Sequence, residues 1–303
     1  MLTHRPGTTL EDLALAGSLM SRAWQSGSPT CVATPAGIEW WHASSWPDEL
    51  GDHLRLWYDG ELAVAWSWHD TTEVEWHAWT GEPARDVAVF REILETVIAE
   101  AGGGTVSTWT AEDDDATIAT LIELGFAPQG RRLSQWQRHG AEGPPPLVPL
   151  AEGYRIRALA GPADIPARVA VHRAAFTPSR LSVEKYERLT TLPHYRFEDD
   201  LVVVAPDGTF AAFAMAWWDG DAAVGEFEPV GTDPAHQRRG LARALLAFGL
   251  HRFFDMGARL VQVYSDTEDA GPEALYPATG FTRRAFHQRY VRPGSDAEGG
   301  STP

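Results

Sequence analysis

Residues 224–256 read VGEFEPVGTDPAHQRRGLARALLAFGLHRFFDM, and the second half of the chain is organised around them. The first seven residues alternate in polarity and include valine and phenylalanine, which predicts a strand. A polar turn follows at 231–240, and from Leu241 onward apolar residues recur at helical spacing. The stretch therefore predicts a strand, a basic turn that contains a glycine, and a helix with a wide apolar face.

The turn has the chemistry of a phosphate-binding loop. The first N–H groups of a helix have no partner within the helix, and the helix dipole favours an anion at that end. Gly240 lets a phosphate approach the backbone, and positive charge comes from Arg238, Arg239 and Arg243. The spacing is not that of a Walker A loop, because no Lys-Ser/Thr pair follows the glycine, and the pattern G-x-G-x-x-G is absent.

The same turn resembles the acetyl-coenzyme-A loop of the GCN5-related N-acetyltransferases, the GNAT family, whose signature is Gln/Arg-x-x-Gly-x-Gly/Ala. Here the signature reads Gln237-Arg238-Arg239-Gly240-Leu241-Ala242. Its place between a strand and a helix gives it weight, because the same six residues in another context would describe only a solvated helix start. The resemblance implies that acetyl-CoA is the cosubstrate.

Composition and charge describe a globular chain of 303 residues, for which two domains of about 150 residues each are expected. Apolar residues make up 44% and charged residues 22%, which is typical of a folded protein. The formal net charge of −17 argues against binding to nucleic acid or to an anionic membrane. It suits a cationic substrate, and it also serves solubility.

Cysteine use and hydropathy point to a soluble, cytoplasmic protein. Cys31 is the single cysteine, so no intrachain disulfide is possible, and we interpret it as a small apolar residue. Glu11 and Asp12 interrupt the short apolar run near the N-terminus, so no signal peptide is expected. No apolar stretch approaches the ~20 residues of a membrane span.

A proline-rich segment divides the chain, because consecutive prolines favour an extended linker. The break begins near Arg138 and contains Pro144-Pro145-Pro146. We expect a first domain over residues 1–140, a linker over 141–153, a second domain over 154–292 and a disordered tail over 293–303.

The second half predicts a mixed, mostly antiparallel sheet flanked by helices. Expected strands lie at 154–157, 200–205, 210–218, 224–230, 259–264 and around 286–291, and expected helices at 163–175, 183–190, 241–256 and 272–276. This order resembles the GNAT fold over nearly all of 154–292. Residues 275–281, Leu-Tyr-Pro-Ala-Thr-Gly-Phe, also resemble the family's Leu-Tyr-x-x-x-Gly-Phe segment.

The first half repeats this layout weakly, so we expect an α/β (α+β) protein with two tandem GNAT-like domains. A hairpin is expected at 54–68, a strand at 73–79 and a helix at 83–101. Between that strand and helix the chain reads Thr80-Gly81-Glu82-Pro83-Ala84-Arg85, which lacks the loop signature and places an acid where a phosphate needs a cation. Leu121 falls where the second half has Tyr276. The first domain is therefore expected to be degenerate.

By resemblance, a splayed strand holds the pantetheine arm and the following loop holds the pyrophosphate. The cosubstrate-binding residues implied in this way are Val230, Gly231, Thr232, Gln237, Arg238, Arg239, Gly240, Leu241, Ala242 and Arg243. His194, His236 and His251 lack the spacing to acids or cysteine that a metal site needs, so no metal is expected.

Acetyl transfer to an amine needs a base and a proton for the leaving thiolate. Glu226 and Glu228 share one face of their strand, and we prefer Glu228 as the base because it lies nearer the expected splay; the alternative is that they are solvated strand residues. Tyr276 is the candidate acid, with a buried aromatic beside Phe281 as the alternative. Pro277 is expected to disturb the helix there.

We therefore expect an acetyl-CoA-dependent N-acetyltransferase that acts on a small-molecule amine by direct attack on the thioester. An aminoglycoside-like amine, a polyamine and an amino-sugar thiol precursor are equally compatible with the residues. One alternative is a non-catalytic acyl-CoA or small-molecule binding or regulatory module on the same scaffold, and another is a different acyl donor. The tryptophans at 76–79 and 217–218 either wall a substrate cavity or fill cores.

Overall fold

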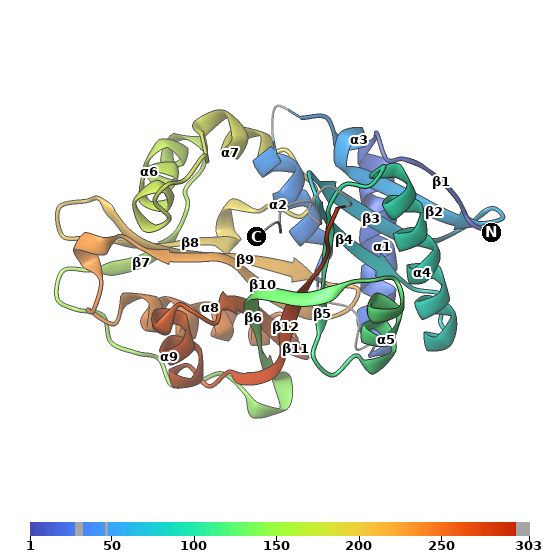
Figure 1. The fold of residues 1–303 in the computed structure, drawn as a ribbon. Helices are drawn as coiled ribbons and strands as arrows, with labels where there is room; N and C mark the ends of the chain where they lie inside the picture. The colour runs from blue at the N-terminus through green and yellow to red at the C-terminus, as the bar shows by residue number, and fades with distance from the viewer. Residues whose placement is uncertain (28–32, 46–47, 295–303) are drawn as a thin grey trace, which may run out of the picture.

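The structure, a computed structural model, describes residues 1–27, 33–45 and 48–294. Cys31 and most of the predicted tail lie outside these ranges. Figure 1 shows helices on both sides of one long sheet, which confirms the expected mixed α/β class. No described helix combines the length and the apolarity that crossing a lipid bilayer requires.

Residues 1–142, here called the first half, supply strands β1 (Thr3–Pro6), β2 (Leu54–Asp59), β3 (Leu62–Asp70), β4 (Glu73–Ala78), β5 (Val106–Ala111) and β6 (Ala127–His139). The helices are α1 (Leu10–Ser26), α2 (Pro35–Ser45), α3 (Leu50–His53), α4 (Pro83–Glu100), α5 (Asp115–Glu123) and the 3-10 turn η1 (Gly140–Glu142). The hairpin, strand and helix predicted between residues 54 and 101 are confirmed.

Residues 143–294, the second half, supply strands β7 (Arg155–Ala158), β8 (Asp200–Val204), β9 (Phe210–Asp219), β10 (Val224–Thr232), β11 (Leu260–Asp266) and β12 (Thr282–Arg292). The helices are α6 (Ile165–Ala175), α7 (Val183–Leu189), α8 (Leu241–Asp255) and α9 (Ala270–Ala278), with 3-10 turns η2 (Pro162–Asp164), η3 (Phe197–Asp199) and η4 (Pro234–His236). Each strand and helix predicted for this half is present.

The final strand of each half lies in the sheet of the other half. β6 pairs antiparallel with the whole of β11, and β12 pairs antiparallel with the whole of β5. The two exchanged strands also pair with each other, which gives the order β1-β2-β3-β4-β5-β12-β6-β11-β10-β9-β8-β7. The division proposed at 141–153 therefore separates two stretches of chain within one continuous sheet.

Strand β6 is not predicted by the sequence. Its buried part runs Ser134-Gln135-Trp136-Gln137-Arg138, in which only the tryptophan is apolar, so the alternation that marks a half-buried strand is missing. Residues 138 and 139, which the proline-rich composition assigns to the break, belong to this strand. Between η1 and β7 the described chain forms neither helix nor strand.

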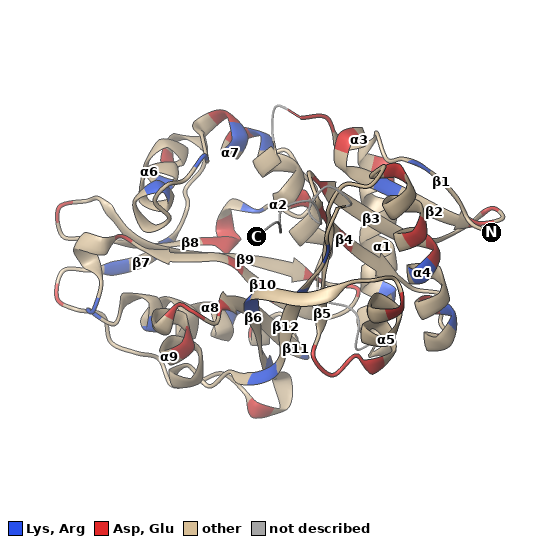
Figure 2. Cartoon of the chain, viewed as in Figure 1, with Lys and Arg blue, Asp and Glu red and all other residues tan. Residues whose placement is uncertain are grey.

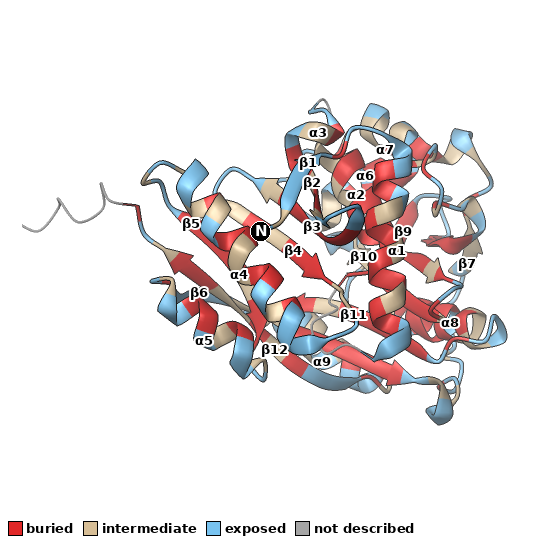
Figure 3. Cartoon of the chain, turned by 90° about the vertical axis from the view of Figure 1, so that its right-hand side faces the viewer, coloured by how far each residue is buried: buried red, intermediate tan, exposed pale blue. Residues whose placement is uncertain are grey.

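Helix α8 packs its apolar face on the sheet, as predicted. Leu245, Leu246 and Leu250 are fully buried in one cluster with Phe227 of β10. Phe248 is an exception, because its side chain is exposed. In Figure 1 α8 and α9 lie on one side of β8–β10 and α6 and α7 on the other, and Figure 3 shows buried residues concentrated where helices meet the sheet.

Helix α2 belongs to the first half in sequence but packs into the core of the second half. Ala36 and Ala43 are buried in the same cluster as Leu189 of α7 and Trp217 of β9. Apolar burial of this kind is the main favourable term in folding, so the two halves share core as well as sheet.

Arg138, at the end of β6, joins the first half to the end of α9. Its guanidinium is largely buried and donates to the Gly280 carbonyl at 2.6 Å and to the Gly143 carbonyl at 2.9 and 2.7 Å. The first of these bonds holds the turn between α9 and β12, and the other two hold the start of the proline-rich segment. A first-half side chain thereby fixes two second-half segments.

We predict that Arg138→Met lowers the free energy of unfolding by about 1.5–3 kcal/mol, because hydrogen bonds from a buried charged donor are lost. Urea denaturation measures this change. Arg131→Met is the control: the Arg131 side chain is 58% exposed and pairs only with Asp266 among the described residues, so a change within about 0.5 kcal/mol is expected. Equal effects of the two substitutions would contradict the prediction.

Candidate active site

Strands β10 and β11 pair at one end and diverge at the other. Their parallel pairing runs from Val224 opposite Leu260 to Phe227 opposite Val263, whereas β10 continues to Thr232. A bulge against β9 lies between Phe227 and Val230, where Pro229 has no N–H to donate. The edge of β10 from residue 228 onward is therefore not paired with β11, which creates a splay of the kind that the family resemblance implies.

The loop after β10 leads directly into the uncapped start of α8. Asp233 accepts from the Ala235 amide at 2.8 Å, and three residues after Ala235 the chain enters the left-handed region, at Arg238 (φ 64°) and again at Gly240 (φ 74°). Glycine adopts this conformation without steric cost. At Gly240, no atom lies within 4 Å of the position that a Cβ would occupy. No side chain caps the N-terminal end of α8. That end remains open to an anion.

The three arginines of this loop carry free positive charge. Arg238, Arg239 and Arg243 are exposed, and none of them forms an ion pair or a hydrogen bond with any residue in the described part of the chain. By contrast, Arg252 near the other end of α8 is paired with Asp199 at 2.5 Å. Unpaired guanidinium groups beside free helix amides favour a phosphate.

Glu226 is buried and held by two donors. Its side chain is only 5% exposed, and it accepts from the Thr34 hydroxyl and from the Gln262 amide at 3.2 Å. Burial raises the pKa of Glu226 to about 7, although both hydrogen bonds act in the opposite direction. Thr34 comes from the first half and lies immediately before α2, which places that helix against the site.

Glu228 stands where the splay begins. It is half-buried, and its carboxylate has no hydrogen-bond partner among the described residues, while its backbone carbonyl accepts from Trp217 Nε1 at 2.6 Å. Burial, and after it the charge of Glu226, raises the pKa of Glu228 to about 8. A carboxylate that is unpartnered and has a pKa near neutrality is suited to accept a proton.

Tyr276 lies in the core that α8 and α9 form beneath the sheet. It is 3% exposed, and its ring lies 6.1 Å from that of Trp136 and 5.8 Å from that of Phe281. Helix α9 continues through Pro277 to Ala278, so the proline does not end the helix at the tyrosine. Burial, followed by the charges of Glu228 and Asp269, raises the pKa of Tyr276, which keeps the phenol protonated.

Comparison with known proteins agrees with this geometry. The acetyltransferase (GNAT) family model matches residues 169–281. The chain is 31% identical over 204 residues to the mycothiol acetyltransferase of Kineococcus radiotolerans, covering 66% of each protein. It is 30% identical over 221 residues to the mycothiol acetyltransferase of Gordonia bronchialis, covering 68% of this chain and 69% of that one. The chain belongs to the GNAT family of acetyltransferases.

A solved structure supports the tandem plan of this GNAT protein. A tandem GNAT protein from the clavulanic acid biosynthesis pathway matches the fold with a TM-score of 0.62 at 12% identity, covering 96% of this chain and 98% of that one. This likeness establishes the architecture of two GNAT-like domains and nothing about the substrate. The chain spans about two thirds of the length of the two curated relatives named above.

The other residues predicted to bind the cosubstrate lie on the unpaired part of β10 and in the loop that follows it. Val230, Gly231 and Thr232 are half-buried on β10 beyond the splay, and Gln237 is exposed and donates to the Thr232 carbonyl at 3.4 Å. Leu241 differs, since its side chain is buried in the core and leaves only its backbone for a ligand. Within the described ranges, no group of three or more histidine, cysteine or acidic residues could hold a metal ion.

The sequence does not predict the polar chain that supports Glu226. Gln262 of β11 donates to Glu226, Gln135 of β6 donates to Gln262 at 3.0 Å, and His287 of β12 lies 3.1 Å from Gln135 Oε1. Because burial lowers the pKa of His287 to about 4, this histidine is neutral and its Nε2–H can donate to Gln135. This series of side-chain hydrogen bonds includes a residue from each of the exchanged strands, β6 and β12.

We predict that Glu226→Gln lowers the pKa of Glu228. The neutral amide removes a negative charge that disfavours ionisation of Glu228, so the variant should ionise at lower pH than the wild type, whose pKa is about 8. A carboxyl-carbon NMR titration of Glu228 gives both midpoints. The control is Glu187→Gln, a change at an exposed residue of α7, which should leave the midpoint in place. An unchanged midpoint in Glu226→Gln would refute the coupling.

Proposed function

We propose that this chain is an acetyl-CoA-dependent N-acetyltransferase that acts on a small-molecule amine, with its working site in the second half. The observation that carries the proposal is the splay between β10 and β11, which lies directly before the uncapped start of α8 and its unpaired arginines. Membership of the GNAT family supports acetyl-CoA as the donor.

The cosubstrate fits the residues that are present. The pyrophosphate would bind the amides and guanidinium groups of 238–243, where backbone donors and positive charge converge. The pantetheine arm would lie along the unpaired edge of β10, past Val230 and Thr232, because extended backbone there offers free hydrogen-bonding groups. Bound in this way, acetyl-CoA supplies an activated thioester.

The proposed reaction is direct transfer without a covalent enzyme intermediate. The amine nitrogen forms a bond to the acetyl carbonyl carbon, and the carbon–sulfur bond breaks. Glu228 accepts the proton that the amine loses, and Tyr276 gives a proton to the thiolate. The two steps are coupled, because the charge of Glu228 is one cause of the raised pKa of Tyr276. When Glu228 takes up its proton that charge disappears, and Tyr276 becomes a stronger acid.

A cationic amine is the proposed class of acceptor. Glu226 and Glu228 place two carboxyl groups at the splay, and Trp217 of the neighbouring strand lies opposite Glu226 and donates its Nε1–H to the Glu228 carbonyl. Acids beside aromatic faces favour an ammonium group. The relatives' shared name, mycothiol acetyltransferase, supports an amine related to mycothiol as the first acceptor to assay.

We predict that Gly240→Glu abolishes micromolar-range acetyl-CoA binding (about −8 kcal/mol), because a carboxylate would stand where the pyrophosphate binds. Calorimetric titration measures the affinity. Gly257→Glu is a matched control at the other end of α8: this glycine also has a positive φ (91°) with nothing within 4 Å, so it adds the same backbone strain and charge. It should retain binding. Loss of binding in both variants, or no binding by the wild type, would overturn the cosubstrate site.

We predict that Tyr276→Phe and Glu228→Gln each lower kcat by about 100-fold without weakening acetyl-CoA binding, since each removes one proton-transfer group. Steady-state kinetics with a mycothiol-type amine, together with calorimetry, separates the two effects. A wild-type protein that binds acetyl-CoA but acetylates none of a broad panel of amines would favour the non-catalytic alternative. Unchanged kcat in both variants would show that other groups move the protons.

A further inference from the structure

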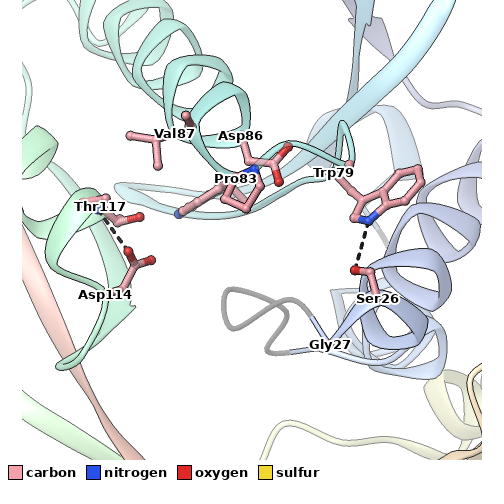
Figure 4. A pocket seen from close by; sticks show the side chains of 12 residues that line it. Ser26, Gly27, Trp79, Pro83, Asp86, Val87, Asp114 and Thr117 are labelled. Atoms are coloured by element: carbon pink, nitrogen blue, oxygen red, sulfur yellow. Dashed lines mark hydrogen bonds between the residues drawn. The ribbon is translucent and has the colours of Figure 1, made fainter.

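A cavity of about 350 Å³ lies in the first half, at the counterpart of the proposed acetyl-CoA site. It is bounded by the end of β4, the starts of α4 and α5, and the end of α1 (Figure 4). β4 and β5 are paired at a single position, Glu73 opposite Ser107, so they diverge even earlier than β10 and β11. Its volume falls within the usual range for small-molecule sites.

The charges around this cavity are the reverse of those around the second-half loop. Glu82 immediately precedes α4, where the second half has Gly240 and its arginines. Asp86 accepts from the Thr80 amide at 2.6 Å and from the Thr80 hydroxyl at 2.7 Å, and Asp114 accepts from the Thr117 amide at 3.1 Å. Carboxylates at both helix starts would repel a pyrophosphate.

Among the described residues around the cavity, acids without an ion pair outnumber cations without one. Arg85 pairs with Asp59 outside the cavity lining. Arg22 lies with its guanidinium carbon 5.3 Å from the centre of the Trp79 ring. Acidic residues also occupy 112–115, where the chain enters α5 (Figure 2): Glu112 and Asp113 pair with arginines, whereas Asp114 and Asp115 form no ion pair with the described residues. The local field therefore attracts a positive charge.

Aromatic side chains supply the apolar walls. Trp76 is buried and stacks on Phe90 with ring centres 3.8 Å apart, so Phe90 covers one face of the indole and holds it in place. Trp79 is half-buried, and its Nε1–H donates to Ser26 at 3.3 Å. Pro83 and Val87 of α4 add apolar lining, and Figure 4 shows them between Trp79 and Asp114. Indole faces attract organic cations more strongly than other aromatic rings do.

We propose that this cavity binds a small organic cation, an ammonium group that carries an alkyl or aryl substituent. The charged nitrogen would lie near Asp86 and Asp114, and the apolar substituent would pack on Trp76 and Trp79. The site is separate from the acetyl-transfer site, and it gives the first half a ligand of its own although this half lacks the acetyl-CoA loop.

The test is calorimetric titration with benzyltrimethylammonium, which has no N–H and therefore cannot be acetylated. Ala84→Arg, a change at an exposed residue that lines the cavity, places a competing cation there and should weaken binding about tenfold or more. Ala99→Arg, at an exposed position near the other end of α4, is the matched control and should bind as the wild type does. Benzoate, with the same ring and the opposite charge, should not bind.

Equal binding of the cation by Ala84→Arg and the wild type, or binding of benzoate as tight as that of the cation, would overturn the proposal. So would the absence of cation binding together with stronger acetyl-CoA binding in Ala84→Arg, because the cavity would then be a second site for the cosubstrate. Trp79→Leu gives an independent check, since it removes an aromatic face without adding charge. Gly240→Glu should leave cation binding intact, which separates this proposal from the acetyl-transfer site.

Discussion

The exchange of β6 and β12 is the constraint on which the rest of the structure depends. Each half ends with a strand that completes the sheet of the other, and the two strands pair with each other at the centre. The strand neighbouring β11, and therefore the geometry on one side of the β10–β11 splay, comes from the first half. Arg138 extends this dependence to the turn after α9, and Thr34 extends it to Glu226.

The centre of the sheet is polar for a reason that follows from the exchange. Glu226, Gln262, Gln135 and His287 come from four different strands, and each buried polar group has a partner in the next strand. Buried polar groups are costly when they lack partners, so this chain fixes the register in which the strands meet. It also keeps Glu226 in the low-dielectric interior, where burial raises the pKa of Glu226. The pKa of Glu228 is raised by burial of its own carboxyl group and, after that, by the charge of Glu226.

The sequence predicts those parts of the site that are continuous in the chain. The strand, loop and helix of 224–255 and the position of Tyr276 in α9 can be read from local pattern and motif. β6 cannot be predicted in this way, because buried glutamines and serine replace the apolar alternation that reports a strand. Thr34 is missed for a different reason: it lies 192 residues from Glu226, and no local pattern links a residue before α2 to a residue in β10.

The shared sheet also has a consequence for any shortened form of the protein. Here deletion of the first half would remove β6, the partner of β11, along with the hydroxyl that holds Glu226. The second half therefore depends on the first for the neighbour of β11 and for one donor to Glu226, although the first half lacks an acetyl-CoA loop of its own.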